Sequence, residues 1–206
     1  LQTWIENRMT APTNRKQSGR ETLAPATLAR EISTIKSLLS FGHKTGYLVF
    51  NVGAVVSAPK VPNDLAERIL TEDEVQRMFR TAEELRTRYH QVTLRTEALL
   101  RFLYSSGARV SEAVGLNWEH LHQMEDGRAT VTLHGKGAKT RHVVINAKVA
   151  AMLEELRPEG SSPKNPVFIT QYGKRLLKEG ALDSIRIVAS RTRICRPVSP
   201  HWLRHA

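Results

Sequence analysis

The spacing of apolar residues changes from helical to alternating in one part of this chain, and this pattern limits the folds that the chain can adopt. Segments 129–133 and 141–145 have the composition and alternation of β-strands. Gly135 and Gly137 lie between them and predict a hairpin loop. Elsewhere the apolar residues recur mainly at helical spacing. We therefore expect a mainly α fold with a small antiparallel β-sheet, an α+β class.

The net charge of the chain indicates which class of molecule it binds. The 206 residues include 31 Lys and Arg against 20 Asp and Glu, a formal net charge of +11, while 40% of residues are hydrophobic. Such a chain can bury a core and still attract a polyanion, most often nucleic acid, because neutralised phosphates release counterions. The alternative is a basic protein whose charge serves only solubility.

Cysteine content and hydropathy bear on the compartment. The single Cys195 allows no internal disulfide, which suits a reducing cytoplasm. No apolar stretch is long enough to span a bilayer. We expect a soluble cytoplasmic protein without contact to membranes.

Two regions of different character predict two domains. Residues 25–41 show an amphipathic helical pattern that Gly42 is expected to end, and the basic, hydroxyl-rich face of this helix could be solvated or could lie on DNA. Two prolines in segment 57–63 then interrupt the pattern. The expected organisation is a helical module over 1–57, a linker over 58–66 and a second domain over 67–206.

The second domain is expected to begin with a capped helix. Thr71 and Glu74 have the spacing of a capping box. Further helices are expected through residues 92–104, 149–156 and 182–189.

Three distant stretches combine cations or histidines with turns or helix starts. The hairpin places Lys136 at its tip, and Ser199-Pro200 predicts the start of a helix with His201 and Arg204 on one face. Together they suggest one phosphate-handling site. The stretches are Gly107-Ala108-Arg109-Val110-Ser111-Glu112, Gly135-Lys136-Gly137-Ala138-Lys139-Thr140-Arg141 and Ser199-Pro200-His201-Trp202-Leu203-Arg204-His205.

Each stretch alone has a simpler explanation. Arg109 could be solvated or paired with Glu112, and a lysine in a glycine-rich turn is usually exposed. His201 and His205 have the spacing of a zinc pair, but Trp202 stands where a metalloprotease motif has glutamate, and no third ligand is evident. We therefore expect no metal site.

Taken jointly, the stretches closely resemble the tyrosine recombinase, or phage integrase, family in order and spacing. Upstream, Thr27 to Asn51 is similar to the last part of the helical core-binding domain, and Leu70 to Val75 to the opening of the catalytic domain. The matching motifs are Tyr104 to Leu116, His134 to Arg141 and Ser199 to His205.

The resemblance implies an enzyme that cleaves and rejoins DNA strands at specific sites through a 3′-phosphotyrosyl intermediate. By this resemblance, Arg109 and Arg204 hold the nonbridging phosphate oxygens through forked, charge-assisted hydrogen bonds. Lys136 is the general acid for the 5′-oxygen, and His201 assists by proton transfer or hydrogen bonding. The cations of the protein would replace a two-metal site, so no cofactor is expected.

Other residues receive supporting roles by the same resemblance. Glu112 orients the first arginine motif, His205 supports the last one, and Lys139 and Arg141 contact the DNA backbone. The expected partner is double-stranded DNA, with a homotetramer assembled on it and a place on the nucleoid. Further DNA contacts are expected from Arg30, Lys36 and Lys44.

One departure from the family pattern concerns the nucleophile. Family members carry a tyrosine beyond the last motif, whereas every tyrosine of this chain precedes it: Tyr47, Tyr89, Tyr104 and Tyr172. The chain also opens without a methionine, so we expect a fragment at both ends, inactive alone. A non-catalytic DNA-binding or architectural protein remains the alternative, and a topoisomerase is disfavoured by the helical N-terminal module.

Overall fold

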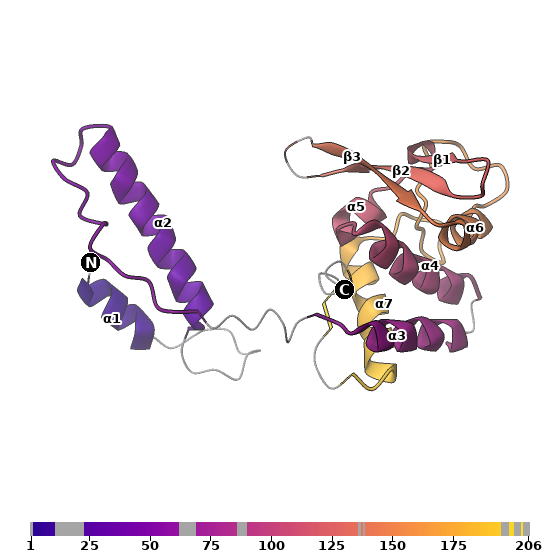
Figure 1. The fold of residues 1–206 in the computed structure, drawn as a ribbon, viewed down its shortest axis with the longest axis horizontal. Coiled ribbons are helices and arrows are strands. Elements are labelled where there is room, and N and C mark those ends of the chain that lie inside the picture. Colours follow the sequence, from indigo (N-terminus) through magenta and orange to yellow (C-terminus); the bar gives the residue numbers. More distant parts are fainter. Residues whose placement is uncertain are drawn as a thin grey trace. The chain divides into compact units, whose positions relative to one another are not determined.

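The computed structural model of the chain separates into two compact units, Leu1–Asp64 and Leu65–Ala206, which are described individually (Figure 1). The residues that the structure describes are 2–10, 23–61, 69–85, 90–135, 137, 139–194, 198–199 and 203.

The first unit is helical. Helix α1 (Gln2–Thr10) packs on α2 (Pro25–Lys44), whose proline occupies the first turn, where no backbone N–H is needed. A small core forms from Ile5, Leu28, Ile32 and Val56. The sequence did not predict α1, because its nine residues show almost no amphipathic pattern.

Helix α2 passes through Gly42 and ends at Lys44, so the predicted stop at Gly42 was wrong. The turn comes at Gly46, whose φ of 81° lies in the left-handed region, and its N–H donates to the His43 carbonyl at 3.1 Å. Gly42 instead allows a close approach, since a Cβ there would lie 3.3 Å from Cδ1 of Leu48. Two glycines near a helix end therefore serve different purposes.

The second unit surrounds one hydrophobic core. Helix α4 (His90–Ser106) contacts α3 (Glu72–Glu84), α6 (Ala147–Glu155) and α7 (Lys178–Arg191). Its Phe102 is fully buried against Phe168. The predicted capping box of α3 is confirmed, because the Glu74 N–H donates to Thr71 Oγ1 at 3.2 Å and the Thr71 N–H donates to Glu74 Oε2 at 2.8 Å.

A three-stranded antiparallel sheet completes this unit in the order β1 (Leu121–Gln123), β2 (Ala129–His134), β3 (Thr140–Ile145). Alternate residues of β2 face the core, and Leu133 pairs with Arg141 across the hairpin. The predicted mainly α fold with a small antiparallel sheet is confirmed. Strand β1 was not predicted, because three residues are too few to show alternation.

Among the described residues, no helix is both long enough and apolar enough to cross a bilayer.

Candidate active site

Arg109 follows a fixed turn between two helices. After α4 the chain turns at Gly107, whose φ is 58°, and Ser106 Oγ accepts a hydrogen bond from the Ala108 N–H at 3.2 Å. Arg109 is the N-cap of helix α5 (Val110–Val114), which packs on α7. The Arg109 side chain is 46% exposed. The backbone is thus held rigidly while the guanidinium stays accessible to a ligand.

Glu112, in the first turn of α5, is the centre of the site. Its side chain is only 2% exposed. Oε2 accepts the Arg109 backbone N–H at 2.8 Å, and Oε1 accepts Nη1 of the same residue at 2.8 Å. Arg141 adds two more bonds, from Nη1 to Oε1 at 2.9 Å and from Nη2 to Oε2 at 2.7 Å. A buried carboxylate is stable here because four donors surround it.

The electrostatics follow from this pairing. Burial alone would raise the pKa of Glu112, but hydrogen bonds from Arg141 and Arg109 outweigh it and lower the pKa from 4.5 to about 2. The hydrogen bonds between Arg141 and Glu112 also raise the pKa of Arg141. Glu112 is therefore ionised throughout the physiological range, which excludes it as a general acid and suits it to positioning arginines.

Replacing Glu112 with Gln should reduce the acid sensitivity of folding. Because the pKa is depressed in the folded state, the stabilisation is complete above pH 4.5 and is lost as pH falls to about 2. The shift corresponds to roughly 3 kcal/mol at neutral pH. Urea unfolding of wild type and Glu112→Gln across this range should give curves that converge at the acid end, whereas Glu125→Gln in the exposed β1–β2 turn should follow wild type. Parallel curves for Glu112→Gln would contradict the prediction.

The base of the β2–β3 hairpin lies against the same carboxylate. The Gly135 N–H donates to the Lys139 carbonyl at 2.8 Å. A Cβ on Gly135 would lie 3.2 Å from Glu112 Oε1, so a larger residue would crowd the carboxylate. Arg141 and Gly135 thus bring the hairpin to the arginine turn, although 29 residues separate Arg141 from Glu112.

The predicted site residues fall into three groups. Arg109, Glu112 and Arg141 are brought together, and Lys139 lies exposed immediately before β3. Among the described residues, the Arg109 side chain bonds only to Glu112, so most of its five N–H donors are left for a ligand. Lys136, His201, Arg204 and His205 lie outside the described residues.

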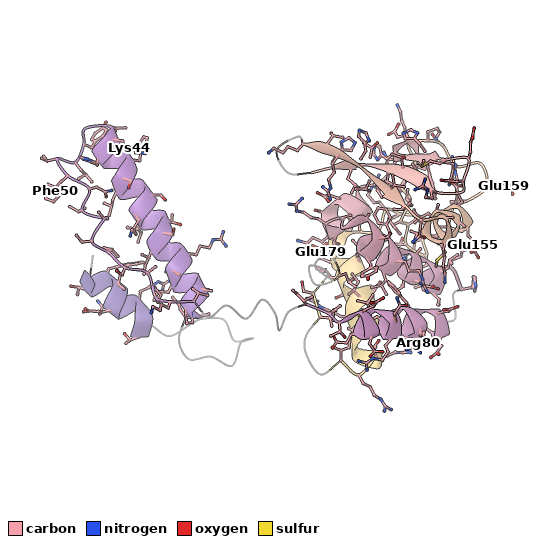
Figure 2. All side chains as sticks on the ribbon, viewed as in Figure 1. Lys44, Phe50, Arg80, Glu155, Glu159 and Glu179 are labelled. Atoms are coloured by element: carbon pink, nitrogen blue, oxygen red, sulfur yellow. The ribbon has the colours of Figure 1, made fainter. Side chains whose placement is uncertain are left out.

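The three cations predicted in the N-terminal module lie on α2, with Lys44 at its end (Figure 2). Arg30 and Lys44 are exposed, while Lys36 Nζ donates to the Val56 carbonyl at 2.5 Å. Lys36 and Lys44 line a hollow of about 670 Å³ together with the hydroxyls of α2. The lining hydroxyl residues are Ser33, Ser37 and Ser40.

Arg175 was missed by sequence reasoning. Its Nη1 donates to the carbonyls of Val114 at 2.8 Å and Leu116 at 3.2 Å, and its Nη2 donates to Asn117 Oδ1 at 2.6 Å. This arginine fastens the C-terminal end of α5, the helix that carries Glu112. No local pattern marks it, because its partners lie 58 to 61 residues away.

Within the described part of the chain, no group of three or more His, Cys, Asp and Glu side chains has the arrangement to hold a metal ion. The His201 and His205 pair lies outside that part.

Family membership is decided by a match over most of the chain. Residues 68–206, which contain the arginine turn and the hairpin, match the model of the phage integrase family. The chain belongs to the phage integrase family. The predicted family is therefore confirmed.

Relatives in this family include tyrosine recombinases. The chain is 32% identical over 188 residues to tyrosine recombinase XerC of Xanthomonas campestris pv. campestris (strain B100), covering 91% of the chain and 56% of that protein. It is 31% identical over 196 residues to XerD of Mycobacterium tuberculosis (strain ATCC 25618 / H37Rv), covering 92% and 62%. The chain thus spans little more than half the length of the curated relatives it matches.

Solved structures of this family share the fold. One is the XerH site-specific recombinase bound to its difH substrate in a pre-cleavage complex, with a TM-score of 0.66 at 21% identity, over 89% of this chain and 54% of that chain. Another is a lambda integrase tetramer bound to a Holliday junction, with a TM-score of 0.63 at 14% identity, over 88% and 52%.

Proposed function

We propose that the whole protein is a site-specific DNA recombinase that cleaves and rejoins DNA strands through a 3′-phosphotyrosyl intermediate. The observation that carries this proposal is the exposed Arg109 guanidinium, held at a fixed helix start by buried Glu112, in a chain of the phage integrase family. A rigid, forked cation of this kind suits a phosphoryl oxygen that gains charge in the transition state.

Each remaining catalytic role rests on the sequence motifs. Arg204 supplies the second guanidinium, Lys136 protonates the leaving 5′-oxygen, and His201 assists by proton transfer or hydrogen bonding. His205 supports this last motif. Energy of the broken phosphodiester is conserved in the tyrosyl linkage, so the reaction needs no nucleotide cofactor.

Double-stranded DNA is the proposed substrate. XerH and lambda integrase were solved on DNA, and this chain carries a net charge of +11. The lambda integrase complex is a tetramer on a Holliday junction. By analogy, this protein would assemble as a homotetramer on DNA. Such binding would place the protein on the nucleoid.

The proposed domain organisation consists of an N-terminal DNA-binding module over 1–57, a linker over 58–66 and a catalytic domain over 67–206. The division into Leu1–Asp64 and Leu65–Ala206 and the family match over 68–206 support it. The N-terminal module would hold the phosphate backbone of DNA through Arg30, Lys36 and Lys44. Lys139, in the loop between β2 and β3, would also contact the DNA backbone.

A covalent capture experiment tests the proposal directly. The whole protein is incubated with a random-sequence library of nicked duplexes, and DNA that stays attached after denaturation is recovered and sequenced. Recombinase chemistry should enrich one target sequence joined through its 3′-phosphate to a tyrosine. Recovery of DNA only under native conditions would favour a non-catalytic binding protein.

DNA binding by the chain itself should weaken steeply as salt rises. Phosphate contacts dominate such binding, so log affinity should fall linearly with log salt, and each lost phosphate contact should reduce the slope by about one. Lys44→Ala should show this reduction in a fluorescence anisotropy titration, because Lys44 is exposed on the proposed DNA face. Arg186→Ala, an exposed arginine paired with Asp183, is the matched control. A flat salt response would contradict the prediction.

A further inference from the structure

A cavity in the second unit shares no lining residue with the site around Glu112. It has a volume of about 370 Å³ and lies between α4, the end of α6 and the segment that follows Val167. Glu155, labelled in Figure 2 on α6, is one of its lining residues. This volume is within the range of small-molecule sites, roughly 300 to 1,000 Å³.

An incompletely paired guanidinium lines this cavity. Arg95, on α4, donates from Nη1 to the Ile169 carbonyl at 2.8 Å, while its Nε is buried and has no hydrogen-bond partner among the described residues. No carboxylate of the described residues lies within ion-pair distance of it. Burial lowers the pKa of Arg95. Arg95 is half-buried, and a cation withdrawn from water is normally compensated by an anion, whereas here a neutral carbonyl is the observed partner.

The other residues that line the cavity indicate what kind of molecule would carry such an anion. A second guanidinium, Arg157, lies 5.0 Å from the ring centre of Trp118 and pairs with Glu154 at 3.5 Å. The walls include the apolar side chains of Val92, Leu156, Val167 and Ile169. The cavity therefore presents the Arg95 guanidinium beside an apolar wall, while Arg157 is paired with Glu154 and the lining carboxylate of Glu155 belongs to an exposed residue.

We propose that this cavity binds a small-molecule carboxylate with a compact apolar body. The carboxylate pairs with Arg95, and the apolar body lies against Val92, Leu156 and Val167. The driving forces are compensation of the half-buried Arg95 charge and burial of apolar surface. The inference is independent of the proposed recombinase activity.

Binding of 4-methylpentanoate to the chain tests the proposal, with NMR chemical shifts of the Val92 and Val167 methyl groups as the readout. Saturable binding with a Kd on the order of 1 mM is expected for a ligand of this size. The uncharged 4-methylpentanamide should bind at least about tenfold more weakly, because it cannot compensate the cation. Equal binding of acid and amide would overturn the assignment of a carboxylate site.

Two variants locate the site. Arg95→Met keeps a long side chain without charge and should remove most of the binding, whereas Arg186→Gln, at an exposed arginine, should not change it. Val92→Phe, which fills the cavity while keeping Arg95, should also block binding, so a folding defect in Arg95→Met leaves the proposal testable. Unchanged affinity in folded Arg95→Met or Val92→Phe, or the absence of saturation in wild type, would overturn it.

Discussion

Arg109→Ala should abolish covalent adduct formation by the whole protein while lowering DNA affinity only a few-fold. We propose that the guanidinium stabilises charge that develops on the phosphate in the transition state, and removing one such donor typically costs about 10² to 10³ in rate or more. Many other cations of this chain of net charge +11 can hold the DNA backbone. Denaturing gels with a labelled nicked duplex measure adducts, and anisotropy measures affinity.

Two further variants sharpen this result. Arg109→Lys keeps the charge but loses the fork, so it should recover little activity. Arg128→Ala removes a comparably exposed arginine that pairs with Asp126 in the β1–β2 turn, and it should cleave like wild type. Full adduct formation by Arg109→Ala would exclude this arginine from the chemistry.

Arg141→Ala should lower cleavage by roughly 10- to 100-fold at saturating DNA and leave the salt dependence of binding unchanged. The sequence suggested a backbone contact for Arg141, but both of its terminal nitrogens bond to buried Glu112. We therefore propose that it positions the hairpin against the arginine turn. Misplacement of a catalytic group by about 1 Å can cost about 10²-fold in rate.

Lys139→Ala is the matched comparison, because Lys139 is exposed two residues earlier in the chain. It should reduce the salt slope by about one and retain cleavage at saturating DNA. A 5′-phosphorothiolate substrate, which needs no strong general acid, should partly rescue Arg141→Ala if the hairpin carries the acid Lys136. A reduced salt slope with normal cleavage for Arg141→Ala would instead support a DNA-backbone contact.

Local sequence was sufficient for much of the fold. The capping box at Thr71 and Glu74 involves residues three apart, and the hairpin around Gly135 and Gly137 is set by alternation and turn chemistry. The turn at Gly107 that precedes Arg109 was likewise recognisable, whereas helix α5 was not predicted. Such features depend on backbone preferences and near neighbours, which a sequence displays directly.

Where a helix stops or a short strand forms was less predictable. Gly42 and Gly46 both resemble stop signals, and the choice between them depended on Leu48 folding back on the helix. Strand β1 exists because β2 offers it hydrogen-bond partners. In both cases the deciding contact comes from a segment whose position the local pattern does not specify.

The sequence by itself determined the family, the motifs and an arginine that follows a turn. Only the tertiary structure decided how the charges are paired: Arg141 turns inward to Glu112, Arg175 fastens the end of α5, and Arg95 stays without a carboxylate among the described residues. The physical reason is that a basic side chain has the same sequence signature whether it faces solvent, DNA or a buried anion. Its free energy depends on burial and on partners far away in the chain, which only folding brings within hydrogen-bond distance.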